Sequence, residues 1–167
     1  MRAHYQLELR NHAGLVVAIR SGCNSVMRTG AELIAHLFAG IGTPITHMGV
    51  GINDTPETDA FSTTALSNTA DSGREPLQGD TEAAIPTEAF AIEIDEIRRV
   101  VRVRVRGTLP AAAAVGRVRE AGLISRAGEN AILYNRITFA PITKGGDHEL
   151  TLFWEISFPY GDLQGIF

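Results

Sequence analysis

Arginine alternates with valine in the middle of this sequence, and that spacing concentrates positive charge on one face of a strand. Arg102, Arg104 and Arg106 stand two residues apart, so an extended chain directs all three side chains to the same side. Like charges this close repel one another unless something opposes them. Because the planar guanidinium group binds carboxylates well, we expect an acidic surface to face this strand.

The rest of the chain offers such a surface, because its charge is segregated. Residues 53–88 carry eight acidic residues against one arginine, a net of −7, whereas residues 98–119 carry seven arginines and no acid. We expect these segments to meet, within one molecule or between neighbouring copies. The alternatives are a solvated arginine face and a nucleic-acid-binding face. The net charge of −4 and the lack of interleaved aromatic residues argue against nucleic acid as a partner.

The predicted interface also includes the C-terminal tail, residues 160–167, which ends on two large apolar residues. A free terminus usually frays, so we expect this apolar one to dock on its own core or on a partner. The predicted interface residues are Arg98, Arg99, Arg102, Arg104, Arg106, Asp54, Glu57, Asp59, Asp71, Glu75, Ile166 and Phe167.

Other residues capable of chemistry form no recognisable catalytic or metal-binding pattern. The five histidines lack the spacing of a metal site, and neither a nucleophile elbow nor a phosphate-binding loop is present. Glu93 and Glu155 are a formal candidate for a glycosidase pair, but two solvent-facing strand positions are the simpler interpretation. Cys23, the single cysteine, excludes an internal disulfide, and we expect it to be buried or half-buried. We therefore predict no catalysis, no metal and no cofactor.

Length and composition indicate one folded domain spanning residues 1–167. The hydrophobic fraction of 44% and the charged fraction of 20% are typical of a chain with a real core. No apolar run approaches the roughly 18 residues that a membrane span needs. The first residues lack the apolar core of a signal peptide.

The elements that must position these residues are mostly strands, because apolar and polar residues alternate over much of the chain. The one good helical pattern runs between Asn24, a candidate N-cap, and Gly40; Thr29 and Glu32 form an alternative capping box. A turn is expected over residues 141–147. Strands are predicted at residues 5–9, 15–19, 45–52, 90–95, 101–106, 117–124, 131–139 and 150–158.

This order of elements predicts a mainly β protein: an antiparallel β-sandwich with one packed α-helix. The first two strands form a hairpin, and Trp154 lies on the apolar face of the last strand, so we place it in the core. Large apolar residues are sparse over residues 53–88, which we interpret as a long acidic loop inserted in the sandwich.

Several short motifs in this order resemble those of small structural proteins of tailed bacteriophages and of phage-derived particles. The resemblance covers residues 5–52 and 89–158. Two departures stand out: the acidic segment typical of that group lacks its glutamate at residues 64–69, and the 53–88 insert is long. The motifs are Asn24–Gly30, Ile45–Gly51, Arg119–Leu123, Leu133–Arg136, Pro141–Lys144 and Leu150–Phe158.

The resemblance implies a structural virion component without catalysis: a repeated subunit or adaptor of a tail, baseplate or fibre-attachment assembly. Its partners would be copies of itself and other virion or injection-particle proteins, without a membrane, nucleic acid or small molecule. It would be found in the virion, after assembly in the host bacterial cytoplasm. The alternative is a carbohydrate- or receptor-binding β-sandwich module that uses the 53–88 loop.

Overall fold

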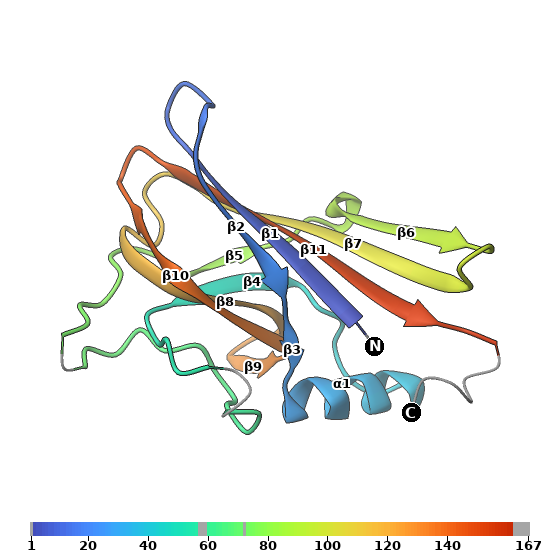
Figure 1. Ribbon diagram of the computed structural model, residues 1–167. Helices are drawn as coiled ribbons and strands as arrows, with labels where there is room; N and C mark the ends of the chain where they lie inside the picture. Colours follow the sequence, from blue (N-terminus) through green and yellow to red (C-terminus); the bar gives the residue numbers. More distant parts are fainter. Residues whose placement is uncertain (1, 57–59, 72, 162–167) are drawn as a thin grey trace.

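Two antiparallel sheets lie face to face in the computed structural model, which describes residues 2–56, 60–71 and 73–161 (Figure 1). The predicted sandwich with one helix is therefore confirmed. The five-stranded sheet has the order β2 (Val16–Cys23), β1 (Arg2–Arg10), β11 (Glu149–Pro159), β7 (Val100–Leu109) and β6 (Phe90–Asp95). The six-stranded sheet has the order β3 (Ser25–Val26), β10 (Asn135–Lys144), β8 (Gly116–Ala127), β4 (His47–Gly51) and β5 (Glu82–Ala84), with β9 (Asn130–Leu133) paired to β8.

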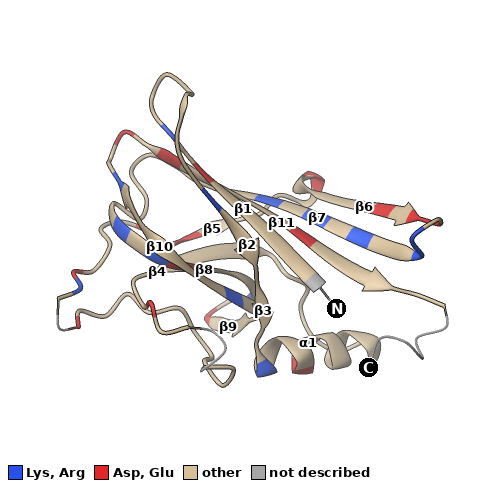
Figure 2. Ribbon diagram, in the orientation of Figure 1, with Lys and Arg blue, Asp and Glu red and all other residues tan. Residues whose placement is uncertain are grey.

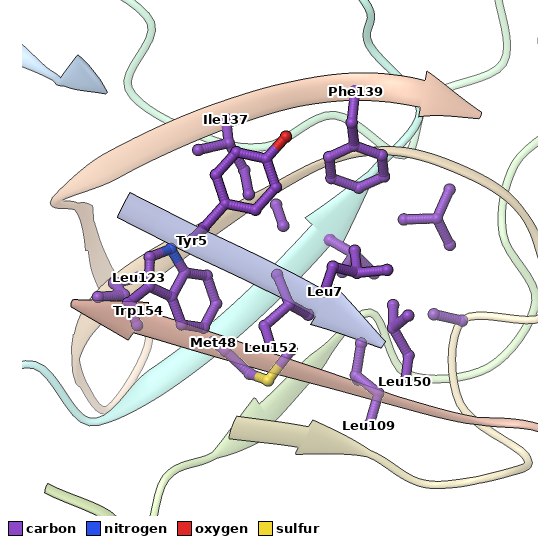
Figure 3. Packing of buried hydrophobic residues seen from close by; sticks show 14 of the residues in the cluster. Tyr5, Leu7, Met48, Leu109, Leu123, Ile137, Phe139, Leu150, Leu152 and Trp154 are labelled. Atoms are coloured by element: carbon purple, nitrogen blue, oxygen red, sulfur yellow. The ribbon is translucent and has the colours of Figure 1, made fainter. Parts of the chain in front are cut away.

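The core forms where the alternating apolar residues of the two sheets meet. Tyr5 on β1 lies opposite Trp154 on β11, and Leu7 lies opposite Leu152, so these side chains share the inner face (Figure 3). Trp154 is buried, as predicted. Gly107 on β7 leaves room for Met48 on β4 of the facing sheet, because an added Cβ would stand 2.3 Å from the Met48 sulfur.

The helix, α1 (Arg28–Phe38), begins later than Asn24 and packs through a glycine. An added Cβ at Gly30 would stand 1.9 Å from the backbone oxygen of Tyr134, so only glycine permits this approach. Met27 occupies the N-cap position without a side-chain cap. The capping-box prediction is wrong, because the Thr29 hydroxyl donates across to the Leu133 carbonyl, which ties the helix to β9.

The segment expected to be one long loop contains regular structure. β5 pairs with β4, and a 3₁₀ turn, η2 (Thr87–Ala89), follows it. The turn expected over residues 141–147 is also wrong in its first half, because β10 continues to Lys144 and pairs there with β8. Residues 162–167 of the predicted tail lie outside the described residues.

The five-stranded sheet is covered unevenly on its inner side. The C-terminal end of β6 and the neighbouring N-terminal end of β7 extend past the strands of the six-stranded sheet (Figure 1). Ile92 and Ile94 alternate as expected for a strand with one apolar face, yet they are 72% and 68% exposed. Their apolar face therefore lacks a covering layer among the described residues.

Candidate interface on the outer face of the five-stranded sheet

The arginines of β7 lie between two strands that carry carboxylates (Figure 2). They alternate along β7 with the buried Val105 and Gly107, so they point away from the core. Arg104 donates from Nη1 to Glu93 Oε1 on β6 at 2.8 Å and from Nε to Glu155 Oε2 on β11 at 3.0 Å. The hydrogen bond to Glu155 and the charge of Glu93 raise the pKa of Arg104. Both carboxylates of the formal glycosidase pair are thus held by a single guanidinium group.

Arg102 extends this network toward the turn between β6 and β7. Its Nη2 donates to Asp95 Oδ2 at 2.5 Å, and its Nε lies 3.9 Å from Glu155. Asp95 also accepts the backbone N–H of Arg98 at 2.9 Å. That backbone hydrogen bond, followed by the hydrogen bond and charge of Arg102, lowers the pKa of Asp95.

The prediction that the acidic loop of the same chain faces these arginines is therefore wrong for Arg102 and Arg104. Neighbouring strands of one sheet bring the opposing charges together first, because cross-strand residues on one face stand only about 5 Å apart. The loop does meet one arginine of the basic segment: Arg119 on β8 donates to Asp54 at 2.8 Å. Asp54 also pairs with Arg74.

Arg106 differs from its two neighbours, because it borders a hollow on this face. In the described part of the chain no carboxylate pairs with Arg106, whose side chain is exposed. β7 continues past its last pairing with β6 at Val105, and a hollow of about 790 Å³ lies over this end of the sheet. His4, Phe153, Glu88 of η2 and Arg106 are among the residues that line it. The hollow offers both charges and an aromatic ring to a partner.

The other predicted interface residues are dispersed. Arg98 is exposed, and its Nε lies 3.9 Å from Asp95. Arg99 has a positive φ of 52°, and its carbonyl accepts the Tyr160 N–H, so it is a turn residue. Asp71 pairs with Arg74 at 3.1 Å, and Glu75 is exposed. Glu57, Asp59, Ile166 and Phe167 lie outside the described residues.

Reasoning from the sequence missed an ion pair that lies inside the molecule. Arg136 on β10 donates from Nε to Glu120 Oε2 on β8 at 2.5 Å, and the two side chains are 0% and 1% exposed. The other oxygen of Glu120 accepts the backbone N–H of Ser67 at 2.8 Å and that of Asn53 at 3.3 Å. Arg136 also donates to the carbonyls of Thr55 and Asn53. This buried cluster fastens residues 53–55 and 67 to the six-stranded sheet.

Glycine makes room for the buried cluster. An added Cβ at Gly51 would stand 2.3 Å from Glu120 Oε1 and 2.6 Å from the Ser67 carbonyl. At Gly122, an added Cβ would stand 2.3 Å from the Asn135 carbonyl. Gly51, Glu120, Gly122 and Arg136 all belong to the short motifs noted in the sequence. Those motifs were the available signal, although nothing local in the sequence pairs Glu120 with Arg136.

Lys144, the last residue of another motif, is also buried. Its ammonium group donates to the Pro110 and Ala111 carbonyls at 2.9 and 2.8 Å. Burial lowers the pKa of Lys144, while the charges of Glu149 and Asp147 oppose that shift. Like Glu120 and Arg136, Lys144 therefore holds a loop in place.

Other chemistry has little support among the described residues. Cys23 is exposed and lies 3.6 Å from the Nδ1 atom of His4, so the expectation of burial is wrong. No group of three His, Cys, Asp or Glu residues in the described ranges is arranged to hold a metal ion. None of the helices described is long and apolar enough to cross a membrane.

Comparison with protein-family models, curated proteins and solved structures found no match to this chain.

Proposed function

We propose that this protein is a structural component of a tailed-phage virion or a related injection particle. It would act as a repeated subunit or adaptor of the tail, baseplate or fibre attachment, after assembly in the bacterial cytoplasm. One observation carries the proposal: Glu120, Arg136 and Lys144, three of the charged residues in the motifs that resemble phage proteins, are buried and hold loops. The shared residues thus build a scaffold, which is what an assembly subunit requires.

The surface supports contacts with copies of itself and with other virion proteins. Arg104 and its carboxylates are partly exposed, and exposed ion pairs contribute only about 0–1 kcal/mol to folding. They can therefore exchange partners at an interface at little cost to the fold. Arg106, exposed beside the hollow, provides a further positive charge for an acidic neighbour.

Sedimentation of a lysate of the source tests the proposal. At low salt we expect the protein in the pellet with a megadalton particle. At about 1 M salt, where charges are screened beyond about 3 Å, we expect partial release. The variant Arg104→Glu with Arg106→Glu should stay in the supernatant. Arg28→Glu reverses an exposed arginine on the helix and should still pellet. A protein that stays soluble and small at both salt concentrations would contradict the proposal.

A second candidate function, a carbohydrate- or receptor-binding module, is favoured by the hollow. Pro86 and Glu88, at the end of the 53–88 segment, line it together with Phe153, which is exposed. A glycan array would detect such binding, and stacking on an aromatic ring should survive high salt. Loss of a glycan signal in Phe153→Ala, with retention in Phe61→Ala, would favour this function over assembly by charge.

A further inference from the structure

We propose that two copies of this chain pair along β6, the free edge of the five-stranded sheet, in an antiparallel arrangement with its two-fold axis at Ile92. The role of this dimer as an assembly contact rests on the proposed function, whereas its geometry rests on β6 itself. The partner of the β6 edge is thus a second copy of the chain, and pairing of the two β6 strands would make one continuous sheet across the dimer.

The β6 edge lacks the features that usually keep sheet edges apart. Within the described residues β7 is its only neighbour, and the register between them runs without a bulge from Phe90 to Asp95. β6 contains neither lysine nor proline, the residues that commonly protect edges. Its two carboxylates, Glu93 and Asp95, are already bound by arginines of β7.

The other long edge of the same sheet is protected, which makes β6 the better site. β2 pairs with β1 through a register shift between Leu9 and Arg10. Arg20 of β2 donates to the Ala140 carbonyl on β10, which closes the side of the sandwich there. A bulge and an arginine are two of the protections that β6 lacks.

β6 also exposes apolar side chains that pairing would bury in part. Ile92 and Ile94 are 72% and 68% exposed on the side that the six-stranded sheet leaves uncovered. Val103 lies opposite Ile92 on β7 and is half-buried. Joining two β6 strands in the register described below would place Ile92 beside Ile92 of the second copy and Ile94 beside its Phe90, and burial of that area favours association.

Among the antiparallel registers that pair side chains on the same face, only one avoids opposed carboxylates and still covers most of the strand. A two-fold axis at Ile92 sets Ile92 against Ile92, Phe90 against Ile94 and Ala91 against Glu93 of the second copy. An axis at Glu93 opposes two glutamates, and an axis at Ile94 opposes Glu93 to Asp95, both unfavourable. An axis at Ala91 pairs only three residues of the strand, whereas the axis at Ile92 pairs five, Phe90–Ile94.

The charges across this join are complementary. Ala91 lies directly opposite Arg104 on the neighbouring strand of its own chain. When Glu93 faces Ala91 of the second copy, the next strand therefore presents that copy's Arg104 on the same face. The small alanine side chain leaves the path between them open. The two-fold axis repeats this contact, so the Glu93 carboxylate of each copy gains a second arginine nearby.

Disulfide trapping tests the register. Cys23, which is exposed, is replaced by serine, and Ile92→Cys is compared with Ile94→Cys in the full chain under mild oxidation. Two cysteines at position 92 face one another within bonding range, so we expect a covalent dimer. Two cysteines at position 94 would stand four residues apart along the strand, about 13 Å, so we expect a monomer. Equal yields from both variants, or none from either, would overturn the inference.

The mass in solution provides the second measurement. We expect dimers of the wild-type chain by analytical ultracentrifugation and monomers of Ile92→Lys. Ile19→Lys changes a similarly exposed isoleucine on β2 and should remain dimeric. Trapping at position 92 without sedimentation in a particle would contradict the proposed function alone. Sedimentation without trapping would contradict this inference alone.

Discussion

Two arginine–carboxylate groups in this molecule share the same chemistry and differ in burial. Arg136 and Glu120 meet at 2.5 Å and are excluded from solvent. Arg104 meets Glu93 and Glu155 at 2.8 and 3.0 Å, with all three side chains between 35% and 50% exposed. Burial makes the first group costly to break, because a charge left alone inside a protein is strongly unfavourable. Exposure leaves the second group weak and free to change partners.

The two groups also differ in what they connect. The buried cluster binds the backbone of Asn53, Thr55 and Ser67, which links an irregular segment to a sheet. The exposed group joins β6, β7 and β11, which backbone pairing already holds together. The comparison teaches that burial and backbone contacts, more than charge, separate a structural ion pair from a surface available for assembly.

Removal of one partner of the buried pair should have the largest effect on stability. We expect Arg136→Met to lower the free energy of unfolding by about 3–5 kcal/mol, because Glu120 would keep its charge without compensation. Replacing both residues by apolar ones of similar size should recover part of that loss. Urea denaturation measures both. A loss below about 1 kcal/mol in the single variant would show that the pair behaves like a surface pair.

Crowding the buried cluster without changing its charges should have the next effect. Gly51→Ala would place a methyl group 2.6 Å from the Ser67 carbonyl and closer still to the Glu120 carboxylate. Because the cluster must shift to admit it, we expect a loss of up to about 3 kcal/mol. Gly146→Ala, at a site without positive φ where an added Cβ would meet only Val115 at 4.0 Å, provides a control for an alanine that crowds nothing. Equal losses in the two variants would argue against a tight cluster.

Lys144 extends the comparison to a buried charge whose hydrogen-bond acceptors are carbonyls. We expect Lys144→Met to cost about 1–2 kcal/mol at neutral pH, because two buried carbonyls lose their donor. Its pKa is below the usual 10.5 in the native protein, so the native state releases its proton first as the pH rises. The unfolded state then binds more protons, and this group's contribution to stability increases up to about pH 10.5.

Denaturation at several pH values in the alkaline range measures that contribution. The wild-type protein should gain stability relative to Lys144→Met as the pH rises toward 10.5. If the difference in unfolding free energy between the wild-type protein and Lys144→Met decreases over this range, the lowered pKa of Lys144 is contradicted.

The exposed group should give the smallest effect on folding. We expect Arg104→Met to lower the free energy of unfolding far less than Arg136→Met does, because solvent weakens exposed ion pairs, and the loss should shrink further as salt is added. Parallel urea denaturation with Arg136→Met provides the measurement. If the Arg104 variant is as unstable as the Arg136 variant, the distinction by burial fails.

Alternation predicted the sandwich well because it is a local signal. Tyr5, Leu7 and Leu9 on β1, and the apolar series on β11, lie inward as their period of two requires. The same signal was insufficient for β6, because a pattern reports which face is apolar and not what covers it. Ile92 and Ile94 match the pattern and are nevertheless exposed.

Both ion-pair groups depend on contacts between residues far apart in the sequence, which local patterns cannot predict. Arg104 reaches Glu155 across 51 positions, and Glu120 reaches Ser67 across 53. Within one molecule the acidic loop does not meet Arg104, because strand order, which the sequence does not give, decides which carboxylate is nearest. A contact with the acidic loop of a neighbouring copy stays a prediction. The burial of Glu120 and Arg136 could not be predicted, because charged residues usually lie at the surface. Their place in the short motifs was the one indication that they matter.

The central pairing of the five-stranded sheet has a consequence for the order of folding. β1 is hydrogen-bonded to β11 along its whole length, from Arg2 opposite Ser157 to Arg10 opposite Glu149. During synthesis, the β1–β2 hairpin leaves the ribosome long before its partner exists, with the apolar face of Leu7 and Leu9 unsheltered. We therefore expect slow folding that is completed only when β11 emerges, and a nascent chain that benefits from chaperones.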